Sequence, residues 1–326
     1  MTYAYINKIE YFLPKKKESN LKFLGLFGKK THASKKIINK IGIENRRVAD
    51  KNIYSNDLAI RSAKKILKTV STQSIDFLIY CTQTPDYLIP TNACIIQEKL
   101  KLKKNIGAFD INLGCSGYVY SLSIAKSLIV SGQAKNILLI TSDTYSKFIK
   151  KNDLSTKLIF SDSSTSTLIS SKKTKDSFKI LNSTYGTDGS GHQDFILNNF
   201  GTRFWKKPKK NGEFIYMAGA NIFNFTLNEI PKAISEFLKK YNFNFDKISY
   251  FIFHQANKFI LKNLQKKLKI PDQRIIIDVK NIGNTVSGTI PIALNRNLQK
   301  IKSGKYALLV GFGVGLSWGI SLIRKI

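Results

Sequence analysis

The sequence is poor in cysteine and in acidic residues, and both shortages narrow its function. It has three cysteines, Cys81, Cys94 and Cys115, with no CxxC pair, so neither a disulfide framework nor a zinc site is expected. We therefore expect a cytoplasmic protein without a metal site. The N-terminal residues lack the apolar run of a signal peptide. The uncharged run Ala307–Ile323 is broken by four glycines, which favours two buried strands around a turn over a membrane span.

Acidic residues number 21 against 53 Lys and Arg, which gives a formal net charge of +32. Such an excess is typical of proteins that bind acidic or phosphorylated partners. It also arises from the bias of a whole proteome, since lysine, isoleucine and asparagine are abundant throughout this chain. Arginine, which bidentate base contacts prefer, is scarce, and no nucleic-acid-binding motif is present. We therefore expect no nucleic-acid partner, whereas proteome bias and an acidic partner both explain the charge.

The chain contains an internal repeat with a spacing of about 170 residues. The apolar stretches "IDFLIYC" and "ISYFIFH" end at Cys81 and His254. Each is followed by a helical stretch, a second strand (in "IGAFDINLG" and "RIIIDVKNIG"), a glycine-flanked turn into a helix, and a closing strand. This alternation indicates an α/β protein, which we divide into halves at 1–172 and 173–326. Equivalent strand ends should then face one another across a pseudo-twofold axis.

Three chemically active side chains converge in this arrangement. Cys115 lies between Gly114 and Gly117 at the start of a helix, where the helix dipole favours its thiolate. His254 ends an apolar strand, and Asn284 lies in the equivalent turn of the second half. The repeat thus predicts one site to which both halves contribute.

Cysteine, histidine and asparagine together allow two chemistries. In a papain-like hydrolase, the histidine deprotonates the cysteine and the asparagine orients the histidine. In the other arrangement the cysteine carries an acyl group, while histidine and asparagine donate hydrogen bonds to a thioester carbonyl and stabilise the enolate formed by decarboxylation. The residue pattern alone does not separate the two. Cys81 and Cys94 are expected to be small buried apolar side chains.

An ordered set of motifs resembles the thiolase superfamily, and within it β-ketoacyl-acyl-carrier-protein synthase III, over nearly the whole chain. The resemblance implies a thiolase-like five-layered αβαβα sandwich of two duplicated halves, usually a homodimer. It implies a condensing enzyme that takes an acyl group from a thioester and joins it to malonyl-acyl carrier protein, giving a β-ketoacyl thioester and CO₂. No cofactor would be bound permanently, since the substrates are acyl thioesters of acyl carrier protein phosphopantetheine or of coenzyme A. The motifs are "GIENRR" (42–47), "TPDYLIP" (84–90), "DINLGCSG" (110–117), "FSDSS" (160–164), "HQAN" (254–257), "GNTVSGTIP" (283–291) and "GFGVGLSWG" (311–319).

The same resemblance implies roles for single residues. Cys115 resembles the acylated nucleophile, and His254 and Asn284 the pair that promotes malonyl decarboxylation. The backbone N–H groups of Cys115 and Val314 would form an oxyanion hole, and Phe312 would adjoin the thiol.

The chain departs from the family pattern where fatty-acid-priming members bind coenzyme A. Lys36 replaces the tryptophan that stacks on the adenine, and Leu154 stands near the position of an arginine of the same clamp. Three further family residues are replaced, by Ala220, Asn224 and Phe259. We therefore expect acyl carrier protein, rather than coenzyme A, to deliver the acyl group, in a specialised lipid or surface-glycan pathway.

Two surface features complete the prediction. We expect "TPDYLIP" to approach the acyl pocket of the partner in a dimer. In relatives an aromatic residue often precedes its proline and limits the length of the acyl chain, whereas Ile89 is smaller and implies a roomier or differently shaped pocket. Three groups of lysines are candidates for contacting an acidic carrier protein or a phosphate. They are Lys36 and Lys40; Lys206, Lys207, Lys209 and Lys210; and Lys262, Lys266 and Lys267.

Two other functions compete with condensation. An acyltransferase on the same fold would move the acyl group from Cys115 to an amine or a hydroxyl without forming a carbon–carbon bond. A non-catalytic synthase subunit is opposed by the presence of Cys115. Release of CO₂ from a malonyl thioester separates the condensing enzyme from the acyltransferase.

Overall fold

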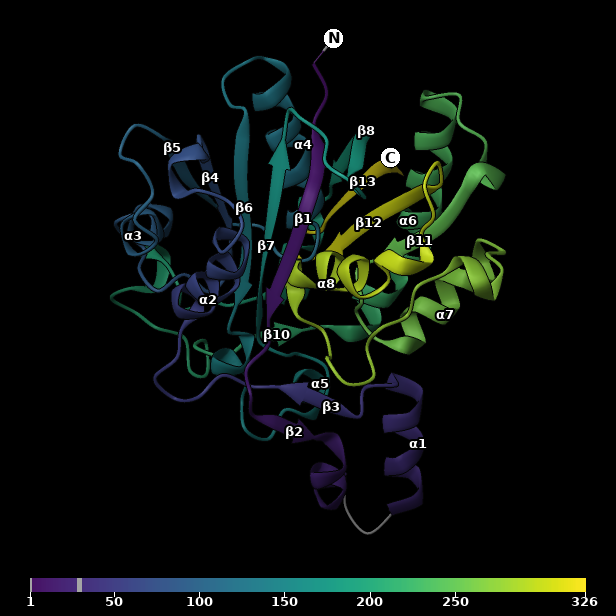
Figure 1. The fold of residues 1–326 in the computed structure, drawn as a ribbon. Coiled ribbons are helices and arrows are strands. Elements are labelled where there is room, and N and C mark those ends of the chain that lie inside the picture. Colours follow the sequence, from purple (N-terminus) through teal and green to yellow (C-terminus); the bar gives the residue numbers. More distant parts are fainter. Residues whose placement is uncertain (1, 28–30) are drawn as a thin grey trace.

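The computed structural model describes residues 2–27 and 31–326 and is built from two half-sheets (Figure 1). The first half-sheet has the strand order β5-β4-β6-β7-β1 and the second β11-β12-β13-β8. Strands β1 and β8 pair, so within the described residues the two form one nine-stranded sheet. The bounds are β1 (Tyr5–Phe12), β4 (Phe77–Cys81), β5 (Gly107–Ile111), β6 (Asn136–Asp143) and β7 (Ser163–Ser170) in the first half-sheet, and β8 (Phe178–Thr187), β11 (Ile248–Phe253), β12 (Tyr306–Gly313) and β13 (Ser317–Lys325) in the second.

The two half-sheets repeat the same strand arrangement, which confirms the duplication seen in the sequence. Strand β4 is parallel to β6, and β7 is antiparallel to β6. In the second half β11 is parallel to β12, and β13 is antiparallel to β12. Strand β4 ends at Cys81, and β11 ends one residue before His254. The predicted boundary between residues 172 and 173 falls in the connection from β7 to β8, and its being a domain boundary stays a prediction.

The second half differs from the first at the predicted strand in "RIIIDVKNIG". Among the described residues, this segment makes only an isolated bridge, between Ile275 and Phe251. The side chain of Gln255 explains the difference, since its Nε2 donates to the carbonyl of Ile276 (3.1 Å) and its Oε1 accepts from the N–H of Asp278 (2.7 Å). A buried amide therefore takes hydrogen bonds that a longer strand pairing would make.

Helices cover both half-sheets and fill the space between them, so the structure has the five αβαβα layers that the resemblance implies (Figure 1). Helices α2 (Ser55–Leu67) and α3 (Asn92–Lys99) pack on the first half-sheet, and α6 (Gly219–Lys240) on the second, where α7 (Lys258–Lys267) packs against it. Helices α4 (Gly117–Val130) and α8 (Thr289–Arg296) contact strands of both half-sheets. The central layer is held by one apolar cluster that includes Leu122, Leu139, Ile290 and Leu309.

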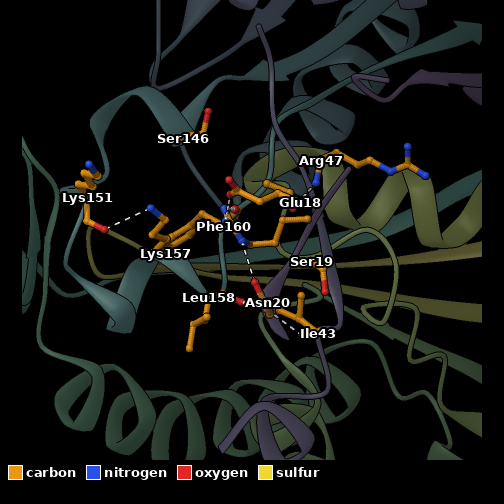
Figure 2. A network of polar contacts seen from close by, with 12 residues as sticks. Glu18, Ser19, Asn20, Ile43, Arg47, Ser146, Lys151, Lys157, Leu158 and Phe160 are labelled. Atoms are coloured by element: carbon orange, nitrogen blue, oxygen red, sulfur yellow. Dashed lines mark hydrogen bonds and ion pairs between the residues drawn. The ribbon is translucent and has the colours of Figure 1, made fainter. Parts of the chain in front are cut away.

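A smaller unit lies at one end of the sandwich and is tied to it by a buried arginine. It contains α1 (Thr31–Ile41), β2 (Lys17–Ser19) and β3 (Asn45–Arg47) (Figure 1). Arg46 is buried, pairs with Glu18, and donates to Asn20 Oδ1 (3.0 Å) and to the carbonyl of Phe160 (3.2 Å). Asn20 in turn donates to the carbonyl of Leu158 at 2.8 Å (Figure 2). The unit is thus anchored to the segment that carries Phe160.

The remaining described α-helix and strands are short. They are α5 (Leu154–Lys157), β9 (Phe195–Ile196) and β10 (Tyr216–Met217). No helix among residues 2–27 and 31–326 is long and apolar enough to cross a membrane. The uncharged run Ala307–Ile323 instead lies in β12, β13 and the turn between them, as predicted. Over the same described ranges, no three His, Cys, Asp or Glu side chains cluster closely enough to hold a metal ion.

Candidate active site

Cys115 lies in a tight turn between β5 and α4. The N–H of Gly117 donates to the carbonyl of Gly114 (2.8 Å), and α4 begins at Gly117. A Cβ atom on Gly114 would stand 2.6 Å from Cγ1 of Val314, and one on Gly313 would stand 3.1 Å from the sulfur of Cys115. Glycine at both positions therefore lets the turn of the first half and the β12–β13 turn of the second approach each other closely.

The protonation of Cys115 differs from the sequence-based prediction. The thiol is buried, and burial raises its pKa above the ordinary value, with the negative charge of Asp143 raising it further. The prediction that the helix dipole favours the thiolate is therefore wrong for this state. The loss of hydration outweighs the dipole, whose effect is modest. A neighbouring base has to take the thiol proton before the sulfur can act as a nucleophile.

His254 is the candidate base, and it lines the same cavity as Cys115. Its N–H continues the β11–β12 pairing by donating to the carbonyl of Val310 (2.7 Å), and its ring is buried. Burial lowers the pKa of His254 to about 3, so the imidazole is neutral. Its Nδ1 lies 2.7 Å from Oγ1 of Thr289, and Phe312 packs edge-on against the ring with 5.6 Å between the centroids.

Asn284 is fixed at both its backbone and its side chain. Its N–H donates to the carbonyl of Ile159 (2.9 Å), which pairs the segment after Gly283 with the strand-like segment around Phe160. Its Oδ1 accepts from the N–H of Val286 (2.9 Å), so its Nδ2 is turned toward Nε2 of His254 at 3.3 Å. Val286 has φ +56°, an uncommon conformation for a β-branched residue, and this local strain accompanies the orientation of the amide.

These three side chains line one cavity of about 100 Å³, which we call the thiol cavity. Phe312 and Gly313 also line it, and the rest of its wall is largely apolar. Ile222 of α6 and Ile260 of α7 form its other side, so the cavity runs between these two helices. The structure therefore brings together Cys115, His254, Asn284 and Phe312, as the sequence predicts, while their chemical roles stay predictions.

A second cavity of about 240 Å³, which we call the Gln83 cavity, adjoins the first at Phe195, which lines both. Val314 lines the Gln83 cavity and packs on Gly114. Leu88 lines it too, whereas Ile89 is 89 % exposed and lines neither of the two cavities. Within a single chain, then, Ile89 is not part of an acyl pocket.

The predicted lysine groups differ in their surroundings. Lys40 of α1 lies over the ring of Phe259 (4.0 Å), which stacks on Phe223 of α6 (5.2 Å between centroids). These rings neighbour Ile222 and Ile260, so Lys40 stands near the α6–α7 side of the thiol cavity. The other predicted lysines, Lys36, Lys206, Lys207, Lys209, Lys210, Lys262, Lys266 and Lys267, are exposed.

Lys262 is not a free surface charge. It pairs with Asp272 (2.8 Å) and donates to Oε1 of Gln265 (2.9 Å). Its charge is already compensated, so Lys262 is a weaker candidate than Lys266 and Lys267 for contacting an acidic carrier protein. Lys209 also makes a local contact, lying 4.8 Å from the ring of Phe204.

The two other cysteines lie in different environments. Cys81 is buried, as predicted, and burial raises its pKa to about 12. Cys94 is exposed, so the prediction of a buried side chain is wrong. Helix α3 buries the face of Ala93 and Ile96, which turns Cys94 toward solvent.

Sequence reasoning missed three polar residues around the site: Thr289, Asp143 and Gln83. Asp143 ends β6, is buried, and accepts hydrogen bonds from the backbone of Gln83 (2.8 Å) and from Ser287 (3.0 Å). A carboxylate at the end of an apolar strand, in a chain with few acidic residues, is a signal that identifies Asp143. Thr289 and Gln83 have no comparable signal, because only tertiary packing brings them to the site.

The geometry also bears on which chemistry is possible. In a papain-like relay the amide orients the imidazole from the nitrogen opposite the thiol. Here Nδ1 of His254 faces Thr289, and Nε2, the nitrogen left to serve Cys115, is the one that Asn284 approaches. The arrangement fits a pair of groups that share one substrate oxygen better than it fits a hydrolase relay.

Comparison with known proteins agrees with this geometry. Residues 109–189 match the family described as 3-oxoacyl-[acyl-carrier-protein (ACP)] synthase III, and residues 238–325 match the C-terminal part of the same family. The β-ketoacyl-[acyl-carrier-protein] synthase III of Clostridium perfringens is 37 % identical over 295 residues, covering 87 % of this chain and 89 % of the relative. That of Staphylococcus epidermidis is 34 % identical over 289 residues, covering 87 % and 88 %.

Solved structures give the same result. A crystal structure of a 3-oxoacyl-(acyl-carrier-protein) synthase III has a TM-score of 0.92 at 36 % identity and covers 99 % of both chains. The 3-oxoacyl-(acyl-carrier protein) synthase of Burkholderia xenovorans has a TM-score of 0.89 at 34 % identity and covers 99 % of this chain and 94 % of its own. The chain therefore belongs to the 3-oxoacyl-[acyl-carrier-protein] synthase III family.

Proposed function

We propose that this protein condenses an acyl group held on Cys115 with malonyl-acyl carrier protein, releasing CO₂ and a β-ketoacyl thioester. One observation carries the proposal: Cys115, His254 and Asn284 line the same cavity, with Nε2 of His254 and Nδ2 of Asn284 3.3 Å apart. A single substrate oxygen can then accept from both groups, as decarboxylation of a malonyl thioester requires.

In the first half-reaction Cys115 becomes acylated. The neutral imidazole of His254 takes the thiol proton at Nε2 while the sulfur attacks the carbonyl carbon of the incoming thioester. The backbone N–H groups of Cys115 and Val314 stabilise the resulting oxyanion. The intermediate collapses by breaking the bond to the leaving sulfur, which receives the proton from His254. Burial of Cys115 keeps its thiol protonated until this step.

In the second half-reaction the malonyl carboxylate leaves as CO₂. The electron pair of the broken carbon–carbon bond enters an enolate, whose oxygen accepts hydrogen bonds from Nδ2–H of Asn284 and Nε2–H of His254. The enolate carbon then attacks the acyl carbonyl on Cys115. The resulting tetrahedral intermediate collapses, the sulfur of Cys115 leaves as a thiolate, and a proton taken up from water restores the thiol.

The two half-reactions need different tautomers of the neutral His254 ring, and the hydroxyl of Thr289 is compatible with both. When the Thr289 hydroxyl donates to the carbonyl of Val286 (3.0 Å), it accepts from Nδ1–H, and Nε2 is free to act as a base. When the hydroxyl turns to donate to Nδ1, the proton of the ring lies on Nε2, which can then donate to the enolate oxygen.

We further propose that the donor is an acyl carrier protein, that the protein is a cytoplasmic homodimer, and that it serves a specialised lipid or surface-glycan pathway. The exposed lysines at positions 206, 207, 209 and 210, together with Lys40 near the α6–α7 side of the thiol cavity, suit an acidic carrier. The loop before Pro90 exposes Tyr87, Leu88 and Ile89, an apolar surface that a second copy would cover.

Intact-mass spectrometry tests the first half-reaction. Incubation with an acyl thioester should add one acyl group to the wild type and to Cys81→Ala and Cys94→Ala, but none to Cys115→Ala. Release of CO₂ from malonyl-acyl carrier protein tests the second. An adduct that persists in Cys115→Ala, or acylation followed by transfer to an amine or hydroxyl without CO₂ release, would contradict the proposal, the latter in favour of an acyltransferase.

A salt series tests the donor. The kcat/KM for the acyl-carrier-protein thioester should exceed that for acyl-coenzyme A and fall as salt shortens the Debye length. Changing Lys206, Lys207, Lys209 and Lys210 to Glu should lower it further, whereas changing the already paired Lys262 should matter less. Equal or better use of acyl-coenzyme A, with no salt dependence for the carrier protein, would refute the carrier-protein proposal.

A further inference from the structure

The Gln83 cavity and its polar side chains indicate which kind of acyl group the enzyme takes. This inference rests on the proposed function, since it concerns the acyl group that Cys115 carries. During condensation the malonyl thioester has to reach His254 and Asn284 through the thiol cavity while Cys115 is still acylated. The thiol cavity measures only about 100 Å³, so the acyl group needs a separate space.

The Gln83 cavity is that space. It measures about 240 Å³ and meets the thiol cavity at Phe195. Val314 and Gln83, which line it, both contact the position of Gly114, the residue before Cys115. None of Cys115, His254 and Asn284 lines this cavity, so an acyl group on Cys115 would enter it by passing Gly114 and Phe195.

The cavity differs from an ordinary pocket for a hydrocarbon chain, because a carboxamide stands in its wall. The hydroxyl of Tyr145, a buried residue, donates to Oε1 of Gln83 (2.5 Å). The ring of Tyr145 is held against Phe160 and Phe195, and the backbone N–H of Gln83 is held by Asp143 (2.8 Å). The polar pair is thus fixed from several sides.

One end of this carboxamide is unused. Among residues 2–27 and 31–326, Nε2 of Gln83 has no hydrogen-bond partner, and if the amide were turned over, Oε1 would be the end without one. An acyl group made only of carbon and hydrogen would cover this end without pairing it, which is unfavourable. A hydroxyl both donates and accepts, so it pairs with either end.

We propose that the Gln83 cavity holds the acyl group of the acyl-enzyme and that Gln83 selects an acyl group bearing a hydroxyl. A site built to bind a substrate hydroxyl discriminates against the analogue that lacks it, because its own polar group is then left unpaired. Since Gln83 is only partly buried, we expect a preference of about 10- to 100-fold in kcat/KM.

The experiment measures acylation of Cys115 by intact mass, with butyryl-, 3-hydroxybutyryl- and 4-hydroxybutyryl-acyl carrier protein as donors. At least one hydroxylated donor should acylate the wild type about tenfold faster or more than the butyryl donor. In Gln83→Leu this preference should vanish and butyryl transfer should rise. The matched control is Gln73→Leu, the same change at an exposed glutamine, which should leave the wild-type preference in place.

The wild-type comparison by itself decides the proposal, even if Gln83→Leu does not fold. Butyryl transfer equal to or faster than both hydroxybutyryl transfers would overturn the selection by Gln83 while leaving the proposed condensation intact. A preference that survives in Gln83→Leu would overturn the role of this residue. Failure of every donor to acylate Cys115 would instead overturn the proposed function itself.

Discussion

The hydroxyl of Thr289 offers a test of the proposal that His254 serves both half-reactions. We choose Thr289→Val, because valine keeps the shape of the side chain and removes only the hydroxyl. Nδ1 of His254 then faces the carbonyl of Val286, a group that already raises the pKa of this histidine. A carbonyl only accepts hydrogen bonds, so the ring proton is held on Nδ1 and Nε2 keeps its lone pair.

The expected result is a split between the two half-reactions. Acylation needs Nε2 as a base and should change less than about fivefold, since the base is still present. Decarboxylation needs Nε2–H as a donor and should fall by about 10²–10³, the effect of losing one donor to an oxyanion. Because burial lowers the pKa of His254 to about 3, the imidazole is neutral from about pH 6 to 8, and the split should not change over that range.

Two assays on the same preparation check this result. Intact-mass spectrometry gives the rate of acylation of Cys115, and CO₂ release from malonyl-acyl carrier protein gives the rate of decarboxylation. Thr289→Ser restores the hydroxyl and should restore decarboxylation, which a merely structural role would not require. Equal losses in the two assays, a larger loss in acylation, or no recovery in Thr289→Ser would refute the role of this hydroxyl.

Three further predictions follow from buried or exposed groups. Burial raises the pKa of Asp143 to about 7 from 3.8, so its contribution to stability is complete below about pH 4 and is lost as the pH rises through 7. In urea unfolding, the free energy of unfolding of the wild type relative to Asp143→Asn should fall by up to about 4 kcal/mol between pH 4 and pH 7. A difference that stays constant over this range would contradict the prediction. Arg46→Ala should cost about 3–5 kcal/mol in thermal or urea unfolding, because it leaves partners of a buried cation unpaired, whereas Glu18→Gln, at a partly exposed position, should cost less; equal effects would count against this account. Ile89→Phe should shift the acyl-enzyme toward shorter acyl chains in a donor panel if Ile89 reaches the partner's pocket in a homodimer, and an unchanged chain profile would speak against that contact.

Much of the fold follows from patterns that are local in the sequence. The apolar runs that end at Cys81 and His254 form β4 and β11, which lie at equivalent positions of the two halves. Such strands can be predicted because their length and burial depend on consecutive residues. The strand predicted in "RIIIDVKNIG" does not form, and the reason is a tertiary contact. Gln255, some twenty residues earlier, occupies its hydrogen-bonding groups, and no local pattern reports on that contact.

The sequence predicts which residues lie at the site, but not their protonation or orientation. Glycines around Cys115 signal the turn, yet whether a thiol at that turn is ionised depends on how completely the second half buries it. A Cβ atom on Gly311 would lie 2.8 Å from the carbonyl oxygen of Cys115, so the β12 backbone lies directly on the turn. Likewise, the orientation of Asn284 depends on the left-handed backbone of Val286, which its β-branched side chain does not suggest.

The duplication also places different side chains at equivalent positions of the two halves. Cys81 and His254 occupy equivalent places at the ends of β4 and β11, and in both cases the turn into a central helix follows further along the chain. Cys81 donates to the carbonyl of Leu113 (3.2 Å) and lies against Gly117, where a Cβ atom would collide with its sulfur. Burial raises the pKa of Cys81 to about 12, as it raises that of Cys115, but Cys81 does not line the thiol cavity. The residue at the strand end of the first half therefore packs against the turn that carries Cys115, while the equivalent position of the second half holds His254, the proposed base. This difference between two copies of one unit contributes to the asymmetry of the site.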